Sequence, residues 1–225
     1  MKLLAIDTTE DACSAALLFD GDTTERFELA PRRHSELILP MMDGLLVDAG
    51  LRLGDLDALA FACGPGAFTG VRIATAIVQG AALGADLPVV PVSSLQALAQ
   101  GTLREHATAA VLAAFDARMG EVYWGAFRVD AGGIMRAAGA EGVYAPHQVA
   151  VPAGDDWVGS GSGWQAYADQ LAARLGDVRR CHGTAMVHAY DVAQLAAVLY
   201  AEGAGVAASQ AQPVYLRNQV AWAKS

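Results

Sequence analysis

Two segments of the chain follow the same pattern, and this repeat limits the possible folds more than any other feature of the sequence. The first, LLAIDTTEDACSAALLFDGD, contains an apolar strand that ends at Asp7, a polar turn, a second apolar strand and an Asp-Gly hairpin signal. The second, VLAAFDARMGEVYWGAFRVDAGG, repeats this order, with Asp116 at the end of its first strand. The repeat predicts two related lobes, which we place at residues 1–104 and 105–225.

Helices are predicted after each pair of strands, with short apolar strands between them. The predicted helices cover residues 35–49, 67–84, 94–100, 163–175 and 191–202, and the strands cover 56–63, 89–92 and 157–159. We expect Ser35 or His34 to cap the first helix and Asp191 to cap the last. We also expect the last helix to pack back on the first lobe. Strands that alternate with helices indicate an α/β protein with mixed sheets.

Composition excludes several classes of protein. With 54% hydrophobic and 17% charged residues, the chain is globular rather than disordered. The most apolar region, residues 73–92, is interrupted by Gly, Gln, Asp and Pro, so we expect no membrane span. The apolar run before Asp7 is too short for a signal peptide, and three cysteines without a C-x-x-C spacing indicate reduced thiols. We therefore expect a cytoplasmic protein.

Charge and missing motifs narrow the chemistry further. A net charge of −9 opposes direct binding of nucleic acid, because phosphate contacts need clustered Lys and Arg. The sequence contains no P-loop and no H-x-x-x-H or H-E-x-x-H spacing. We therefore expect no metal site and no catalytic residue in this chain.

The turn after the first strand is the main candidate for chemistry. Asp7, Thr8 and Thr9 resemble a phosphate-binding turn in which the acid holds Mg²⁺ through water. Asp116 ends the equivalent strand, so it is expected to face Asp7 across a cleft between the lobes. The alternative is an ordinary turn, in which these side chains bind nearby backbone amides.

The helices predicted at 35–49 and 67–84 carry more apolar surface than one packed side requires. Small residues align along the second helix, and such a line lets another helix approach closely. The sequence therefore predicts a protein interface on these two helices. Its expected residues are Leu37, Ile38, Met41, Met42, Leu45, Phe68, Ala74, Ile77 and Ala81. The alternative is that both helices are enclosed within one monomer.

Several segments together resemble one family. AIDTT, HSELILP, GPGAFTGVR, PVSSLQALA, DARMGEVY and PVYLR are similar to segments of the TsaB family, formerly YeaZ, of bacterial tRNA threonylcarbamoyladenosine biosynthesis proteins. The most specific motif is GPG-x-FTG-x-R, formed here by Gly64, Pro65, Gly66, Phe68, Thr69, Gly70 and Arg72. Ala67 replaces the usual Ser of the motif, and Ala74 replaces a usual Gly. The resemblance implies the two-lobed actin-like, sugar-kinase and Hsp70-type fold.

The resemblance also implies a function. The family is a non-catalytic relative of TsaD, which transfers a threonylcarbamoyl group to the adenosine beside the tRNA anticodon. Ser94 and Leu98 appear here at the positions of the two metal-binding histidines of TsaD, and neither side chain replaces an imidazole. The implied role is a scaffold that binds and activates TsaD, with the ATPase TsaE as third component and a homodimer when alone. No cofactor is implied, apart from ATP or ADP at the interface of the complex.

Two other functions remain open from the sequence. One is a nucleotide-dependent phosphotransferase or ATPase that uses Asp7 and Asp116 around Mg²⁺. The other is a metallopeptidase, for which the sequence shows no metal ligands. If the chain is a scaffold, we expect Ile38→Asp or Ala74→Arg to abolish the complex while the monomer stays folded.

Overall fold

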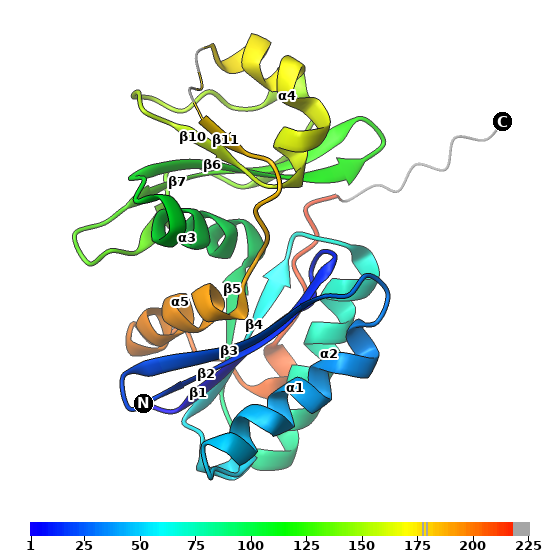
Figure 1. Ribbon diagram of the computed structural model, residues 1–225, viewed down its shortest axis with the longest axis vertical. Coiled ribbons are helices and arrows are strands. Elements are labelled where there is room, and N and C mark those ends of the chain that lie inside the picture. The colour runs from blue at the N-terminus through cyan, green and yellow to red at the C-terminus, as the bar shows by residue number, and fades with distance from the viewer. Residues whose placement is uncertain (177, 179, 218–225) are drawn as a thin grey trace, which may run out of the picture.

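The computed structural model describes residues 1–176, 178 and 180–217 of the 225-residue chain. In this part of the chain two β-sheets lie one above the other, with helices between them and on their outer sides (Figure 1). Both sheets mix parallel and antiparallel pairs. The predicted α/β fold, with duplicated mixed sheets flanked by helices, is therefore confirmed. Residues 218–225 of the second predicted lobe lie outside the described residues, and the lobe boundary stays a prediction.

The first sheet has the strand order β3-β2-β1-β4-β5. Its strands are β1 (Leu3–Asp7), β2 (Ala12–Phe19), β3 (Asp22–Leu29), β4 (Ala58–Gly64) and β5 (Val89–Ser93). Every residue of β1 and β4 is buried, which explains their unbroken apolar runs. Asp20 and Gly21 have φ values of 53° and 90°, so they form the tight turn that the Asp-Gly pair predicts between β2 and β3.

The second sheet has the order β11-β10-β6-β7-β8, and β9 pairs with β7. Its strands are β6 (Ala110–Arg118), β7 (Glu121–Val129), β8 (Met135–Ala137), β9 (Gly142–Tyr144), β10 (Val158–Ser160) and β11 (Arg180–His182). β6 pairs antiparallel with β7 and parallel with β10, just as β1 pairs with β2 and β4. The repeat in the sequence is thus also a repeat in sheet topology.

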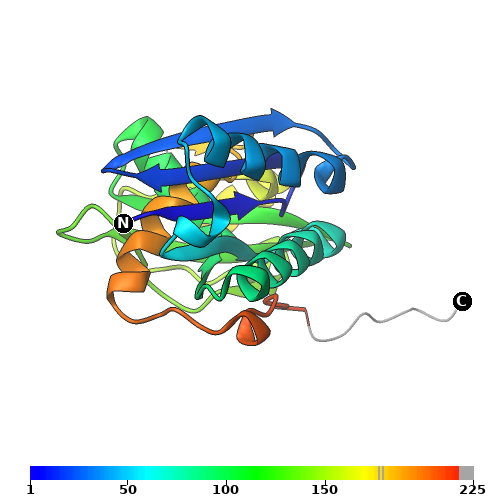
Figure 2. The same cartoon turned by 90° about the horizontal axis from the view of Figure 1, so that it is seen from below.

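The α-helices of the described residues cover the faces of the two sheets. They are α1 (His34–Asp48), α2 (Phe68–Ala85), α3 (Ser94–His106), α4 (Ser162–Leu175) and α5 (Ala189–Ala201). α3 and α5 lie between the sheets, with α5 against β1 and β2 of the first sheet. α1 and α2 lie on the outer side of the first sheet (Figure 2).

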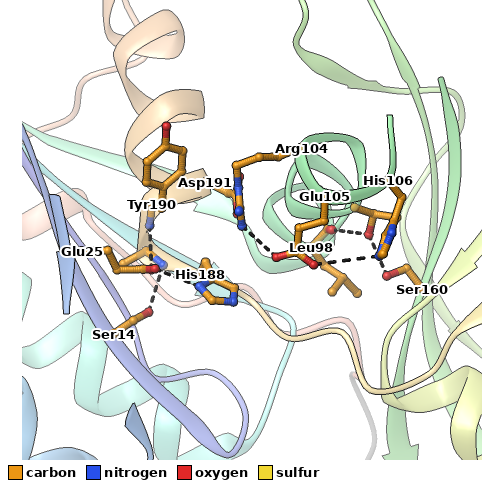
Figure 3. Close-up of polar contacts among 12 residues, drawn as sticks. Ser14, Glu25, Leu98, Arg104, Glu105, His106, Ser160, His188, Tyr190 and Asp191 are labelled. Atoms are coloured by element: carbon orange, nitrogen blue, oxygen red, sulfur yellow. Dashed lines mark hydrogen bonds and ion pairs between the residues drawn. The ribbon is translucent and has the colours of Figure 1, made fainter. Parts of the chain in front are cut away.

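The predicted end of α3 and the predicted cap of α5 are wrong, because contacts distant in sequence decide them. α3 continues past the predicted end at residue 100 to His106. Gly101 does not end the helix; a Cβ there would lie 2.9 Å from Asp191 Oδ2, so the glycine lets α5 approach. Asp191 does not cap α5 either, because it accepts hydrogen bonds from Arg104 Nε and Nη2 at 3.0 and 2.9 Å (Figure 3).

The N-terminus of α5 is capped by the first sheet instead. Ser14 Oγ accepts from the Ala189 amide at 2.9 Å, and Glu25 accepts from the Tyr190 amide at 3.0 Å (Figure 3). These two bonds satisfy amides that a helix leaves without partners. At α1, likewise, neither predicted cap forms; His34 is buried, with its Nε2 3.1 Å from the Ala12 carbonyl oxygen.

The start of α2 is pressed against the turn that follows β1. Thr8 Oγ1 donates to the Gly70 carbonyl at 2.7 Å, and the Ala67 amide donates to the Thr9 carbonyl at 2.7 Å. A Cβ at Gly70 would lie 1.9 Å from the Thr8 carbonyl oxygen, closer than any real contact. Position 70 therefore requires a residue without a side chain.

α2 is also unusually open for an apolar helix. It is the one helix of the described residues that is long and apolar enough to cross a membrane by length and composition alone, a weak indication. Only 33% of it is buried, so much of its apolar surface has no neighbour within the monomer.

We predict that Gly70→Ala lowers the free energy of unfolding by about 3 kcal/mol, because the added methyl group must push two backbone segments apart. Gly80→Ala on the same helix is the matched control. No atom lies within 4 Å of a Cβ at Gly80, so this change should raise stability by about 1 kcal/mol through helix propensity alone. Urea denaturation measures both, and a Gly70→Ala variant as stable as the parent would contradict the described packing.

Candidate functional site

The turn after β1 is not an open phosphate site in this structure. Asp7, Thr8 and Thr9 are all fully buried. Asp7 Oδ1 accepts from the Thr9 amide at 3.2 Å and from Thr9 Oγ1 at 2.7 Å, while Thr8 is bound to Gly70. The expectation of a phosphate-binding turn is therefore wrong for this structure, because the start of α2 fills the space in front of the turn.

Asp7 is nevertheless an unusual carboxyl group. Burial raises its pKa to about 7, and the hydrogen bonds from Thr9 and the charge of His188 only partly oppose this rise. Its Oδ2 has no hydrogen-bond partner among the described residues. An ionised Asp7 is therefore costly in the folded protein, and the group favours its protonated form.

A cleft of about 700 Å³ does lie between the lobes, but Asp7 does not line it. The carboxylates that do are Glu10 and Asp11 from the first lobe and Asp116 from the second. Asp116 therefore faces Glu10 and not Asp7, which corrects the predicted pair. Asp7 belongs to the strand and points into the packed interior, whereas Glu10 lies three residues further on in the turn.

Ser162 joins the two sides of this cleft. Its hydroxyl donates to Glu10 Oε1 at 2.7 Å and accepts from the Asp116 amide at 3.1 Å. Burial raises the pKa of Glu10 to about 7. Asp116 already accepts hydrogen bonds from Arg118 and from the Tyr167 hydroxyl. Sequence reasoning missed Glu10, although the acidic pair Glu10-Asp11 directly after the phosphate-like turn could have indicated it.

The described residues contain no group of three or more His, Cys, Asp or Glu side chains placed to hold a metal ion. Ser94 and Leu98, at the positions where TsaD was expected to carry histidines, are both buried. Ser94 Oγ accepts from the Gly64 amide at 3.1 Å, so it has a structural partner.

Most of the residues predicted for a protein interface lie inside the monomer. Ile38, Met41, Met42, Leu45 and Ala74 are buried in one cluster between α1, α2 and the first sheet. In this structure they cannot contact a partner, and Ile38→Asp or Ala74→Arg would disrupt the core rather than an interface. The apolar arc of each helix includes the side that packs on the sheet, and the sequence pattern alone did not separate the two sides.

The other predicted interface residues are reachable from outside. Phe68 is 59% exposed, and Leu37, Ile77 and Ala81 are half-buried. We define the outer face of α1 and α2 as these four residues together with six others that were not predicted from the sequence. They are Leu39, Val47, Ile73, Ala76, Gly80 and Leu83, of which Leu83 is 79% exposed.

The motif loop joins this face to the end of the described chain. Gly64, Pro65 and Gly70 are buried, Gly66 is half-buried, and Thr69 and Arg72 are exposed. Arg72 stacks on the Phe68 ring, with Cζ 3.3 Å from its centroid, and Nε donates to the Tyr215 hydroxyl at 2.8 Å. The GPG-x-FTG-x-R and PVYLR segments, far apart in sequence, therefore meet at the mouth of the cleft.

The C-terminal segment, residues 211–217, is bound to both lobes. Gln79 Nε2 donates to the Ala211 carbonyl at 2.7 Å, and the Val214 amide donates to the Cys63 carbonyl at 2.8 Å. Arg217 forms an ion pair with Glu121 of β7. The segment thus crosses from the first lobe to the second along one side of the cleft.

Comparison with known proteins finds relatives that match the sequence over its whole length. Residues 27–223 match the family model described as TsaD, tRNA N6-adenosine threonylcarbamoyltransferase. The chain is 47% identical to the tRNA threonylcarbamoyladenosine biosynthesis protein TsaB of Escherichia coli, over 100% of this chain and 98% of that protein. It is 42% identical to TsaB of Haemophilus influenzae, over 100% and 97% of the two chains.

A solved structure shows the same similarity in three dimensions. YeaZ from Pseudomonas aeruginosa superimposes with a TM-score of 0.90 at 46% identity, over 96% of this chain and 99% of that chain. The chain therefore belongs to the TsaB family, formerly YeaZ, of tRNA threonylcarbamoyladenosine biosynthesis proteins.

Proposed function

We propose that this protein is a non-catalytic scaffold that binds and activates a TsaD-type enzyme through the outer face of α1 and α2. The observation that carries the proposal is the exposed side of α2, where apolar and small residues alternate with no acid. Ile73, Ala76, Gly80 and Leu83 follow one another at helical spacing, and a Cβ at Gly80 would meet no atom within 4 Å. Such a surface lets a partner helix approach closely.

The partner is expected to bury large side chains on this face. Phe68 and Leu83 are 59% and 79% exposed, and each contributes about 1 to 2 kcal/mol when it is removed from water. In the absence of the enzyme, a second copy of the chain can cover the same face, which supports a homodimer when the protein is alone. We propose TsaE as the third component of the complex. We propose no direct contact between this chain and nucleic acid, and we place the complex in the cytoplasm.

The interior of the protein supports the absence of a reaction of its own. The turn that would hold a phosphate is closed by α2, and its acid is buried. The positions of the two expected histidines carry Ser94 and Leu98. We propose no cofactor for the chain itself, and ATP or ADP only at the interface of the assembled complex.

A nucleotide-dependent phosphotransferase or ATPase is the alternative. The cleft between the lobes favours it, because Glu10, Asp11 and Asp116 place carboxylates around a space large enough for a small molecule. This function requires Asp7 or its neighbours to act on a bound nucleotide, and it predicts turnover of ATP by the isolated chain.

We predict that Gly80→Arg weakens binding to TsaD from the same organism by about 100-fold, because the long side chain holds the partner helix away. The monomer should stay folded, since there is open space around Gly80. Gly139→Arg is the matched control: its Cβ also meets no atom, but it lies in the second lobe. Isothermal titration calorimetry gives both dissociation constants, and equal binding by the two variants would contradict the proposed face.

We predict that Asp7→Asn separates the two functions. The pKa of Asp7 is raised on folding, so its contribution to stability is present at low pH and is lost as pH rises toward 7. Between pH 5 and pH 7 the parent should therefore lose about 2 kcal/mol more stability than the Asn variant. Asp169→Asn, at an exposed position of α4, is the control.

The same variant is then mixed with TsaD and, separately, with Mg-ATP. If the chain is a scaffold, Asp7→Asn should bind TsaD as tightly as the parent does, and neither the parent nor the variant should hydrolyse ATP. ATP turnover by the parent that disappears in Asp7→Asn would support the phosphotransferase instead.

A further inference from the structure

Arg72 is held in a fixed orientation at the rim of the candidate interface. Its guanidinium carbon lies 3.3 Å from the centroid of the Phe68 ring and 5.5 Å from that of Tyr215. Its Nε donates to the Tyr215 hydroxyl at 2.8 Å. These contacts fix the plane of the guanidinium and leave the two terminal nitrogens available. The edge formed by these two nitrogens can make two parallel hydrogen bonds with an oxyanion.

Several other arginines of the described chain pair with acids, whereas Arg128 and Arg174 donate to backbone carbonyls. Arg104 binds Asp191, Arg136 binds Asp130 and Glu202, and Arg217 binds Glu121. Arg72 has no carboxylate within 4 Å among the described residues. It is also the one charged residue in the sequence of α2. The helix therefore presents a single positive charge on an otherwise uncharged apolar surface.

Arg72 lies on the side of α2 that forms the outer face. Ala76 and Gly80 follow it at intervals of four residues, so the three positions lie above one another on the helix. A partner helix that covers Ala76 and Gly80 must pass close to the Arg72 guanidinium. Burial of this charge without a counter-charge would oppose binding.

We propose that Arg72 binds a carboxylate, an Asp or Glu side chain of the catalytic partner, and that Tyr215 is the positioning residue that orients it. This inference rests on the proposed function. A single carboxylate adds one negative charge and fits an apolar interface. A nucleotide or an RNA would add several negative charges beside Glu10, Asp11 and Asp116 of the adjacent cleft, on a chain of net charge −9.

The C-terminal segment thereby gains a role in recognition. Tyr215 comes from the segment that is bound to Cys63 on one lobe and to Glu121 on the other. Its hydroxyl oxygen accepts the hydrogen bond from Arg72 Nε, and this bond keeps the Arg72 side chain from turning away from the outer face. Pre-orientation of this kind reduces the entropy that is lost on binding.

The test measures the dissociation constant for TsaD at about 50 mM and about 300 mM NaCl. Arg72→Gln should weaken binding about 10-fold at low salt and reduce its salt dependence, because it removes one charge pair. Arg72→Lys should restore the salt dependence but not the full affinity, since an ammonium cannot pair with two oxygens in parallel. Tyr215→Phe keeps the ring, removes the acceptor for Nε, and should weaken binding about 3-fold.

Arg128→Gln is the matched control. Arg128 also stacks on an aromatic ring, that of Trp157, and also lacks a carboxylate within 4 Å among the described residues, but it belongs to β7 of the second lobe. Its replacement should leave both constants unchanged.

Three outcomes would overturn the proposal. If Arg72→Gln binds within twofold of the parent while Gly80→Arg fails to bind, the face is correct and the carboxylate contact is wrong. If Arg72→Gln and Tyr215→Phe lower the melting temperature but leave affinity and salt dependence unchanged, Arg72 only holds the C-terminal segment. If the parent itself does not bind TsaD, both this inference and the proposed function fail.

Discussion

The close contact between the start of α2 and the turn after β1 determines much of this structure. Gly66 and Gly70 bring the helix backbone against the carbonyl oxygens of Thr9 and Thr8, at distances that no side chain allows. The contact closes the turn to phosphate and buries Asp7, whose pKa rises as a result. In the second lobe the start of α4 also makes a close approach, but to the strand itself, since a Cβ at Gly161 or Gly163 would meet the Ala114 backbone within 3.1 Å. The turn after β1 is thus closed by α2, whereas Asp116 and Arg118 at the end of β6 still line the cleft.

The same contact fixes which side of α2 remains open. One side of the helix packs on β4 with Val71, Ala74 and Val78, and the opposite side presents Ala76, Gly80 and Leu83. Arg72 lies at one end of this open side and is oriented by the C-terminal segment. The recognition surface that we propose is therefore on the outside of the first lobe. In the cleft between the lobes, Glu10 is bound to Ser162 and Asp116 is paired with Arg118. This arrangement suits a protein that acts by contact with an enzyme.

The sequence predicts the repeated strands, the helices and the fold class, because each depends on local hydrophobic pattern and turn residues. It does not predict the caps of α5, since Ser14 and Glu25 come from strands about 170 residues earlier. It predicts an interface on α1 and α2, but among the residues it selects are Ile38, Met42 and Ala74, which pack on the sheet. The apolar arc of a helix gives the extent of its apolar surface. Only the tertiary structure shows which part of that surface packs on the protein's own sheet and which part stays exposed. Glu10 was missed for a similar reason, because its place beside Asp116 depends on how the lobes meet.

The most direct test is hydrogen–deuterium exchange of the chain alone, of the chain with TsaD, and of the chain with Mg-ATP. It shows whether the chain binds TsaD through the outer face of α1 and α2, and whether it binds a nucleotide at the ends of β1 and β6. We predict that TsaD slows exchange in residues 36–48, 66–84 and 211–217, and that Mg-ATP alone leaves exchange in residues 7–11 and 116–120 unchanged. Slower exchange at residues 7–11 and 116–120 with Mg-ATP, together with no change in 66–84 on addition of TsaD, would contradict it.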